Sequence, residues 1–232
     1  MILVSLLIDV IIPAYNEEES IGRVMDDIPH NIVREVIVCN NNSTDGTAKV
    51  AVDRGATVLL ASDKGYGSAC LVGLDHIHRK NEKPDIVVFL DGDYSDHPEE
   101  MHKLISPIVN DGMEMVIGSR ALGTLEKGSM QPQQIFGNWL ATSLISLFYS
   151  YTFTDLGPFR SITYDALCKI DMQDKDFGWT VEMQVKAAKL NLKCTEVAMS
   201  YRKRIGVSKV SGTIKGTILA GHKILWTIFK LL

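Results

Sequence analysis

Apolar and polar residues alternate in blocks along the first half of the chain. Five mostly apolar runs have the length of a strand, and they cover residues 6–12, 33–39, 56–60, 86–90 and 113–117. Segments with helical character lie between them, over residues 20–28, 46–54, 67–78 and 98–110. Apolar strands that are separated by helices are typical of a parallel sheet covered on both faces. The pattern therefore predicts an α/β fold with a mostly parallel central sheet and helices on both faces.

The pattern is less regular after residue 120. Helices are predicted over 135–149, 180–190 and 212–232, and a strand over 193–201. The last helix carries lysines on an apolar body, and two placements are open for it. It docks on the sheet or on a second copy, or it lies at a membrane interface, where basic residues and Trp are favoured. The tryptophans are expected to be packing residues, with Trp139 alternatively facing a lipid.

Polar segments follow each of the five predicted strands of the first half. They cover residues 13–18, 40–47, 63–67, 91–93 and 118–120. Any one of them is compatible with an ordinary solvated turn, because Asn, Asp, Gly and Ser are turn formers. In open parallel sheets, however, ligands bind beyond the carboxyl ends of the strands. Five such segments at one edge of the sheet therefore predict a ligand site there.

Asp91 and Asp93 are the chemical centre of this predicted site. They follow the wholly apolar run 86–90, and residues two apart on an extended chain point the same way. Two carboxylates on one side offer hard oxygen ligands to Mg²⁺ or Mn²⁺. Such a cation bridges the phosphates of a nucleotide diphosphate and offsets the charge of the leaving group. The glycines of the 65–67 segment permit either close approach of a ligand or a simple turn.

These segments together resemble the family 2 glycosyltransferases, in particular the dolichyl- or polyprenyl-phosphate sugar synthases. The resemblance runs from about residue 9 to residue 212. It rests on Pro-Ala-Tyr-Asn-Glu at 13–17, Asn-Asn-Ser-Thr-Asp-Gly-Thr at 41–47, Lys-Gly-Tyr-Gly at 64–67 and Asp-Gly-Asp at 91–93. In the second half it rests on the segments 155–160, 179–183 and 201–209. The chain departs from the family pattern at Asn41, where the family has Asp, and at Pro158, where it has a small residue.

The resemblance implies a GT-A fold and a role for individual residues. Nucleotide-binding residues are implied at Pro13, Ala14, Tyr15, Glu17, Asp45, Lys64, Asp91 and Gly92. Contacts to phosphate or acceptor are implied at Arg120, Arg160, Arg204, Ser208 and Lys209. Catalytic roles are implied for Asp93, Glu182 and Asp155, and the metal ligands are Asp91 and Asp93. One domain is predicted over residues 1–232, with a nucleotide-binding half at 1–120 and an acceptor half at 121–232 that ends in the amphipathic helix.

The function implied is inverting transfer of a hexose from a UDP- or GDP-sugar to a polyprenyl phosphate, with Mg²⁺ or Mn²⁺. A soluble, glycan or protein hydroxyl acceptor is the alternative. A hydroxyl must lose its proton, so it needs a base such as Glu182 or Asp155, whereas a phosphate is already anionic. A nucleotidyltransferase is disfavoured because 13–18 lacks a Gly-rich basic loop. Intact Asp91 and Asp93 disfavour a non-catalytic nucleotide-sugar-binding protein.

Charge and cysteine content restrict the partners and the compartment. A net charge of −4 gives no basic footprint for nucleic acid. The cysteines have no CxxC spacing, which argues against a zinc site and is typical of reduced thiols. No stretch reaches the roughly 18 apolar residues of a membrane-spanning helix. We expect a cytoplasmic protein that contacts the cytoplasmic face of a membrane peripherally if its acceptor is a lipid, in an oligomeric state that the sequence leaves open.

Overall fold

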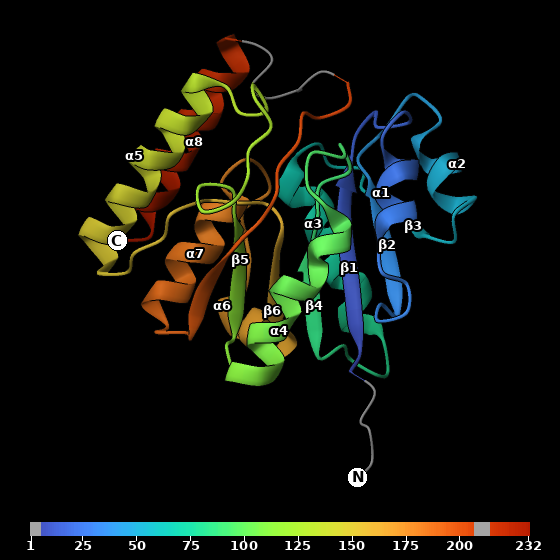
Figure 1. Ribbon diagram of the computed structural model, residues 1–232, viewed down its shortest axis with the longest axis horizontal. Helices are drawn as coiled ribbons and strands as arrows, with labels where there is room; N and C mark the ends of the chain where they lie inside the picture. The colour runs from blue at the N-terminus through green and yellow to red at the C-terminus, as the bar shows by residue number, and fades with distance from the viewer. Residues whose placement is uncertain (1–5, 207–213) are drawn as a thin grey trace.

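The structure, a computed structural model, describes residues 6–206 and 214–232. Its centre is a sheet in the order β3-β2-β1-β4-β6-β5-β7 (Figure 1). The strands are β1 (Ile8–Ala14), β2 (Glu35–Asn40), β3 (Thr57–Leu60), β4 (Ile86–Phe89), β5 (Met115–Ser119), β6 (Arg160–Thr163) and β7 (Cys194–Ala198). All pairings are parallel except those of β6, which runs antiparallel to β4 and β5. The mostly parallel α/β sheet predicted from the sequence is confirmed.

Helices cover both faces of this sheet and bury a separate apolar cluster on each. One face packs against α1 (Ile21–Asp27), α2 (Thr47–Val52) and α4 (Met101–Asp111), which follows the short 3₁₀ turn Pro98–Glu100. The other face packs against α3 (Tyr66–Arg79), α5 (Pro132–Tyr149), α6 (Tyr164–Ile170), α7 (Trp179–Lys189) and α8 (Ile214–Lys230). Within β1, Val10 and Ile12 belong to the first cluster and Ile11 to the second, as the period of a strand requires.

Strand β6 and helix α6 were not predicted. The four residues of β6 include Arg160 and Ser161, so they form no apolar run, yet both side chains are fully buried. The Ser161 hydroxyl donates to the carbonyl oxygen of Leu104 at 2.9 Å, and the Arg160 guanidinium donates to several carbonyl oxygens. Polar residues enter this strand because each one finds a backbone partner. Residues 212–213 of the predicted last helix lie outside the described residues.

Helices α5 and α8 lie side by side at the outer edge of the molecule (Figure 1). The Tyr149 hydroxyl at the end of α5 donates to the carbonyl oxygen of Ile228 in α8 at 2.6 Å. Trp179 is a packing residue, as expected, and is 1% exposed. Trp139 and Trp226 are not, because they are 60% and 57% exposed on α5 and α8. No helix within the described residues is long and apolar enough to cross a membrane.

Candidate active site

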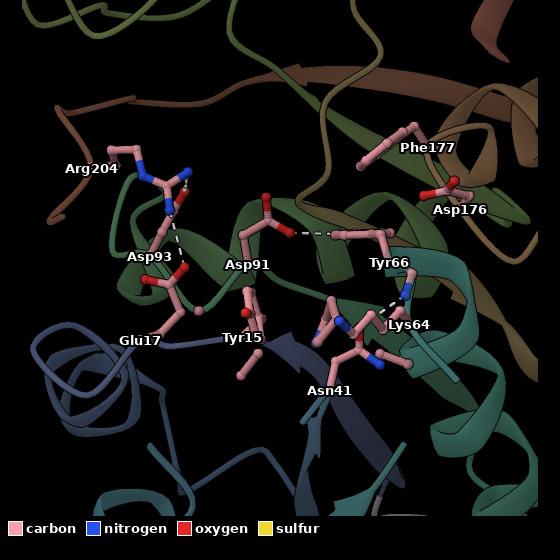
Figure 2. A pocket seen from close by; sticks show the side chains of 15 residues that line it. Tyr15, Glu17, Asn41, Lys64, Tyr66, Asp91, Asp93, Asp176, Phe177 and Arg204 are labelled. Atoms are coloured by element: carbon pink, nitrogen blue, oxygen red, sulfur yellow. Dashed lines mark hydrogen bonds and ion pairs between the residues drawn. The ribbon is translucent and has the colours of Figure 1, made fainter. Parts of the chain in front are cut away.

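The carboxyl ends of β1, β2 and β4 open into one cavity of about 500 Å³ (Figure 2). The start of α3, the loop before α7 and the segment after β7 complete its wall. The lining residues are Pro13, Ala14, Tyr15, Glu17, Asn41, Lys64, Gly65, Tyr66, Ala69, Asp91, Gly92, Asp93, Asp176, Phe177 and Arg204. The residues implied to bind nucleotide thus lie together, with Asp45 as the exception.

Asp45 lies beside this cavity and organises two turns instead of lining it. Its carboxylate accepts the backbone N–H of Thr47 at 3.0 Å and that of Glu18 at 3.2 Å. These bonds join the turn after β1 to the start of α2, and they lower the pKa of Asp45 against the opposing effect of burial. The N-cap of α2 is Gly46, directly after Asp45.

Asp91 is a carboxyl group held at the floor of the cavity. The Tyr66 hydroxyl donates to Asp91 Oδ1 at 2.9 Å. Burial, and after it the charge of Asp93, raise the pKa of Asp91 to about 7, although Tyr66 and Arg204 act in the opposite direction. Two carboxylates that repel each other in a poorly solvated place are stabilised by any cation that binds both.

Asp93 has such a cation close by in the form of Arg204. Arg204 Nη1 lies 3.0 Å from Asp93 Oδ2, and Arg204 Nη2 lies 3.0 Å from Glu17 Oε1 (Figure 2). The other oxygen of Asp93 accepts the Ser95 backbone N–H at 2.9 Å. The buried Nε of Arg204 has no hydrogen-bond partner within the described residues. Arg204 therefore holds the two carboxylates together and keeps one donor for a further acceptor.

The donor set at Asp91 and Asp93 suits a divalent cation that arrives with a diphosphate. Within 6–206 and 214–232, no three His, Cys, Asp or Glu side chains gather into a cluster that could hold a metal ion by itself. Mg²⁺ is usually held by one or two carboxylates together with substrate phosphates and water. Two carboxylates in an open cavity fit that arrangement, and a closed cage of protein ligands is not required.

Arg120 and Asp155 form a buried ion pair outside the cavity lining. Arg120 Nε and Nη2 donate to the two Asp155 oxygens at 2.8 and 2.7 Å, and the Arg120 backbone N–H donates at 2.7 Å. The guanidinium also lies over the Tyr201 ring, 5.2 Å from its centroid. Such bidentate geometry is the strongest form of this pair. In this structure the two side chains are therefore paired with each other, and neither lines the cavity.

Arg160 is likewise occupied by the protein itself. It donates to the carbonyl oxygens of Gly157 at 2.9 Å, Leu156 at 3.1 Å and Thr180 at 3.1 Å. Burial lowers its pKa to about 10. The side chain is fully buried and does not line the cavity. The implied phosphate contact at Arg160 is not seen in this arrangement, and those at Ser208 and Lys209 lie outside the described residues.

Glu182 faces the loop that precedes α7, residues 173–178. Its carboxylate accepts the backbone N–H of Gln173 at 3.1 Å and of Asp174 at 2.7 Å, and it pairs with Lys186 at 2.8 Å. It does not line the cavity. The same loop places Asp176 in the cavity wall. Glu182 therefore positions this loop and does not itself face the cavity.

The glycines of the 65–67 segment allow this 173–178 loop to approach. A Cβ on Gly65 would lie 2.1 Å from the Lys175 carbonyl oxygen, and one on Gly67 would lie 2.0 Å from that of Asp174. Gly65 also has φ +135°, which side chains rarely adopt. The group that comes close to these two glycines is therefore the backbone of the 173–178 loop. The hydroxyl and N–H of Ser68 both donate to the Lys175 carbonyl oxygen.

Five residues that line the cavity were given no role from the sequence: Asn41, Tyr66, Ala69, Asp176 and Phe177. The Asn41 side chain accepts the Gly65 N–H at 2.9 Å and donates to the Asp63 carbonyl oxygen at 2.6 Å, so it orders the loop before α3. Asn41 and Tyr66 stood inside predicted motifs and could have been proposed from that position. Asp176 and Phe177 carry no such signal.

Known proteins resemble this chain over most of its length. The family model described as "Glycosyl transferase family 2" matches residues 9–168. The undecaprenyl-phosphate mannosyltransferase of Micrococcus luteus is 29% identical over 221 residues, 89% of this chain and 88% of that protein. An uncharacterized glycosyltransferase of Mycobacterium tuberculosis is 31% identical over 216 residues, 92% of this chain and 94% of that protein. Glycosyltransferase AglJ of Haloferax volcanii is 30% identical over 197 residues, 84% of this chain, which spans only 63% of AglJ.

A solved structure with the same fold is glucosyl-3-phosphoglycerate synthase from Mycobacterium tuberculosis, in complex with Mn²⁺, uridine diphosphate and glucosyl-3-phosphoglycerate. It superposes with a TM-score of 0.78 at 21% sequence identity, covering 97% of this chain and 80% of that one. At this level of identity the similarity shows the fold, and it confirms the predicted GT-A class.

Proposed function

Because this chain belongs to glycosyl transferase family 2 and is a glycosyltransferase, we propose that it moves a hexose from a nucleotide-diphosphate sugar to a polyprenyl phosphate. The observation that carries the proposal is the placement of Asp91 and Asp93 in one cavity with Tyr15, Glu17 and Lys64. A carboxylate pair, a half-exposed aromatic ring and a cation are the groups that a metal-bound diphosphate and a nucleoside need. The similarity to the undecaprenyl-phosphate mannosyltransferase supports the choice of acceptor.

In this proposal Asp91 and Asp93 would hold Mg²⁺ or Mn²⁺, and the bound cation would supply positive charge that offsets the charge of the leaving diphosphate. Arg204 leaves Asp93 and donates to the diphosphate, using the Nε that lacks a partner among the described residues. Tyr15 and Glu17 follow β1 directly and contact the nucleoside, and Lys64 contributes a positive charge at the cavity wall.

The transfer itself needs one bond to form and one to break at the anomeric carbon. An oxygen of the acceptor phosphate attacks that carbon from the side opposite the leaving group, so the configuration inverts. The bond to the diphosphate breaks, and its electron pair leaves with the nucleoside diphosphate. Because the acceptor oxygen is already anionic, no side chain must remove a proton. The protein contributes orientation and charge, which is how most of the barrier is lowered in such sites.

A hydroxyl acceptor is the second candidate, and Asp176 is the observation that favours it. Asp176 lines the cavity from the 173–178 loop, away from the strand ends. Burial and the neighbouring Asp174 raise its pKa, which Lys223 partly offsets. A carboxylate of this kind suits a general base better than a contact to an anionic phosphate. A solved structure of the same fold, glucosyl-3-phosphoglycerate synthase, is a complex with phosphoglyceric acid, a soluble molecule, and this supports the second candidate.

One assay separates the two candidates. Sugar transfer to a short polyprenyl phosphate is compared with transfer to the matching free alcohol, for the wild type and for Asp176→Asn. For a phosphate acceptor we expect preference for the phosphate and a modest loss in the variant. For a hydroxyl acceptor, loss of the base should cost roughly 10²–10⁴-fold. Preference for the alcohol together with such a loss would refute the polyprenyl phosphate and leave the second candidate.

A further inference from the structure

The outer sides of α5 and α8 expose an apolar surface that the sheet does not use. We call it the outer apolar face, and its principal side chains are Phe136, Trp139, Leu147, Phe148, Trp226 and Phe229. They are between 39% and 71% exposed. The face is continuous across the two helices, because the Phe148 and Phe229 rings lie 5.5 Å apart.

Helical spacing gathers these residues on one side of each helix. Phe136, Trp139 and Leu147 are separated by three and eight residues, which places them along one side of α5. Only Ala141, Thr142 and Ile145 of that helix are buried. Helix α5 therefore exposes several large apolar side chains, and an exposed apolar patch of this kind marks an interaction site.

Neither helix of this face carries an acidic residue. The 18 residues of α5 include no Asp, Glu, Lys or Arg, and α8 has no acid, while its Lys223 pairs with Asp174 at 2.9 Å. The whole chain has a net charge of −4, so the absence of acids here is local. Lys230 is exposed at the end of α8. Anionic lipid headgroups are the complement of such a surface.

We propose that the outer apolar face docks this protein on the surface of a membrane that contains anionic lipids. Aromatic side chains at the level of the headgroups and lysines beside them are the pattern of an interfacial contact. The described helices are too short or too polar to cross the bilayer, so the face lies on it. A second copy is a poorer occupant, because neither α5 nor α8 carries an acid that could pair with Lys230 of another copy.

The face is connected to the cavity through Asp174. Lys223 of α8 pairs with Asp174 at 2.9 Å, and Asp174 accepts the N–H of Asp176, which lines the cavity. Docking would thus hold the cavity wall formed by the 173–178 loop near the lipid. The inference deepens the proposed function, since a polyprenyl phosphate would be presented there, but docking itself needs neither donor nor acceptor and can be tested alone.

The test is binding of the full chain to vesicles of phosphatidylcholine with 30% phosphatidylglycerol, and to vesicles of phosphatidylcholine alone. We expect binding to the anionic vesicles that weakens as salt is raised. The double variant Trp139→Ser/Trp226→Ser should bind at least about tenfold more weakly, because each substitution removes roughly 100 Å² of apolar surface from the contact with the membrane. Lys230→Gln should lower binding about fivefold, from one cationic charge near the surface.

Matched controls make the result specific. Val52→Ser and Val109→Ser remove side chains of similar exposure, 56% and 57%, from α2 and α4 on the opposite face, and should leave binding unchanged. Bromine-labelled lipid should quench Trp139 and Trp226 but not buried Trp179, as single-tryptophan variants report.

Two outcomes would overturn the docking proposal. The first is equal binding by the wild type and the double variant. The second is a dimer, seen by light scattering, that the double variant abolishes while vesicles bind neither protein. The proposed function is judged separately with a water-soluble short polyprenyl phosphate, on which the double variant should match the wild type. If the wild type transfers no sugar to this soluble acceptor, the proposed acceptor class is refuted, and the docking proposal is unaffected.

Discussion

Replacing Asp91 by Asn should make the metal-free protein more stable at alkaline pH. Asp91 is a carboxyl group whose pKa is raised to about 7, first by burial and then by Asp93. Asn has nearly the same shape, and its oxygen still accepts the hydrogen bond of Tyr66. The substitution therefore removes a charge that is costly to hold in the metal-free protein, with little change in packing.

The size of the effect follows from the difference between the folded and unfolded pKa. Between the ordinary value of 3.8 and about 7, the folded protein binds more protons than the unfolded chain, so stability falls as pH rises through this range. The full difference corresponds to at most about 4 kcal/mol. Because Asp91 lines a cavity that water enters, we expect about 2 kcal/mol at pH 8, a change of roughly 4–8 °C in melting temperature. Below about pH 4 the contribution vanishes.

The assay is thermal unfolding in chelator at pH 4 and pH 8. We expect Asp91→Asn to melt only slightly above the wild type at pH 4 and well above it at pH 8, because the charge cost grows between the unfolded and the folded pKa. Addition of Mn²⁺ with a nucleotide diphosphate at pH 8 should then raise the melting temperature of the wild type more than that of the variant. Equal melting temperatures at pH 8, or a gain of the same size at both pH values, would show that Asp91 carries no such charge cost.

Three further results are expected. Arg204→Ala should raise the affinity for Mn²⁺ without nucleotide about tenfold, because a charge-assisted contact to Asp93 no longer competes, and calorimetry with an unchanged affinity would contradict this. Gly67→Ala should lower the free energy of unfolding, measured by denaturant titration, by about 2 kcal/mol or more, because its Cβ would lie 2.0 Å from the Asp174 carbonyl oxygen. The control Gly137→Ala should not lower it, because a Cβ there meets no atom within 4 Å. Asp45→Ala should weaken binding of the donor but not of the acceptor, through the turns it joins, which is again measured by calorimetry.

The parallel strands were predictable because each is an apolar run that ends in turn-forming residues. The convergence of Tyr15, Lys64 and Asp91 followed from the same rule, since parallel strands end at one edge of the sheet. Strand β6 was not predicted because it contains no apolar run, and its buried polar side chains are stabilised by hydrogen bonds instead. Asp176 was not predicted as a site residue because it reaches the cavity from a loop that is distant in sequence. Glu182 and the glycines of the 65–67 segment position that loop. No periodicity in the sequence encodes that contact.

The cations assigned to phosphate from the sequence divide into two kinds, and this affects how variants are interpreted. Arg120 forms a bidentate pair with buried Asp155, so Arg120→Ala would leave an unpaired buried carboxylate, at a cost of about 3–5 kcal/mol. Arg160 holds backbone carbonyls, so its loss would disturb β6 first. Reduced transfer by either variant would report on stability as much as on phosphate. Lys64 and Arg204 line the cavity, and theirs are the described cationic side chains whose removal tests contact with a phosphate directly.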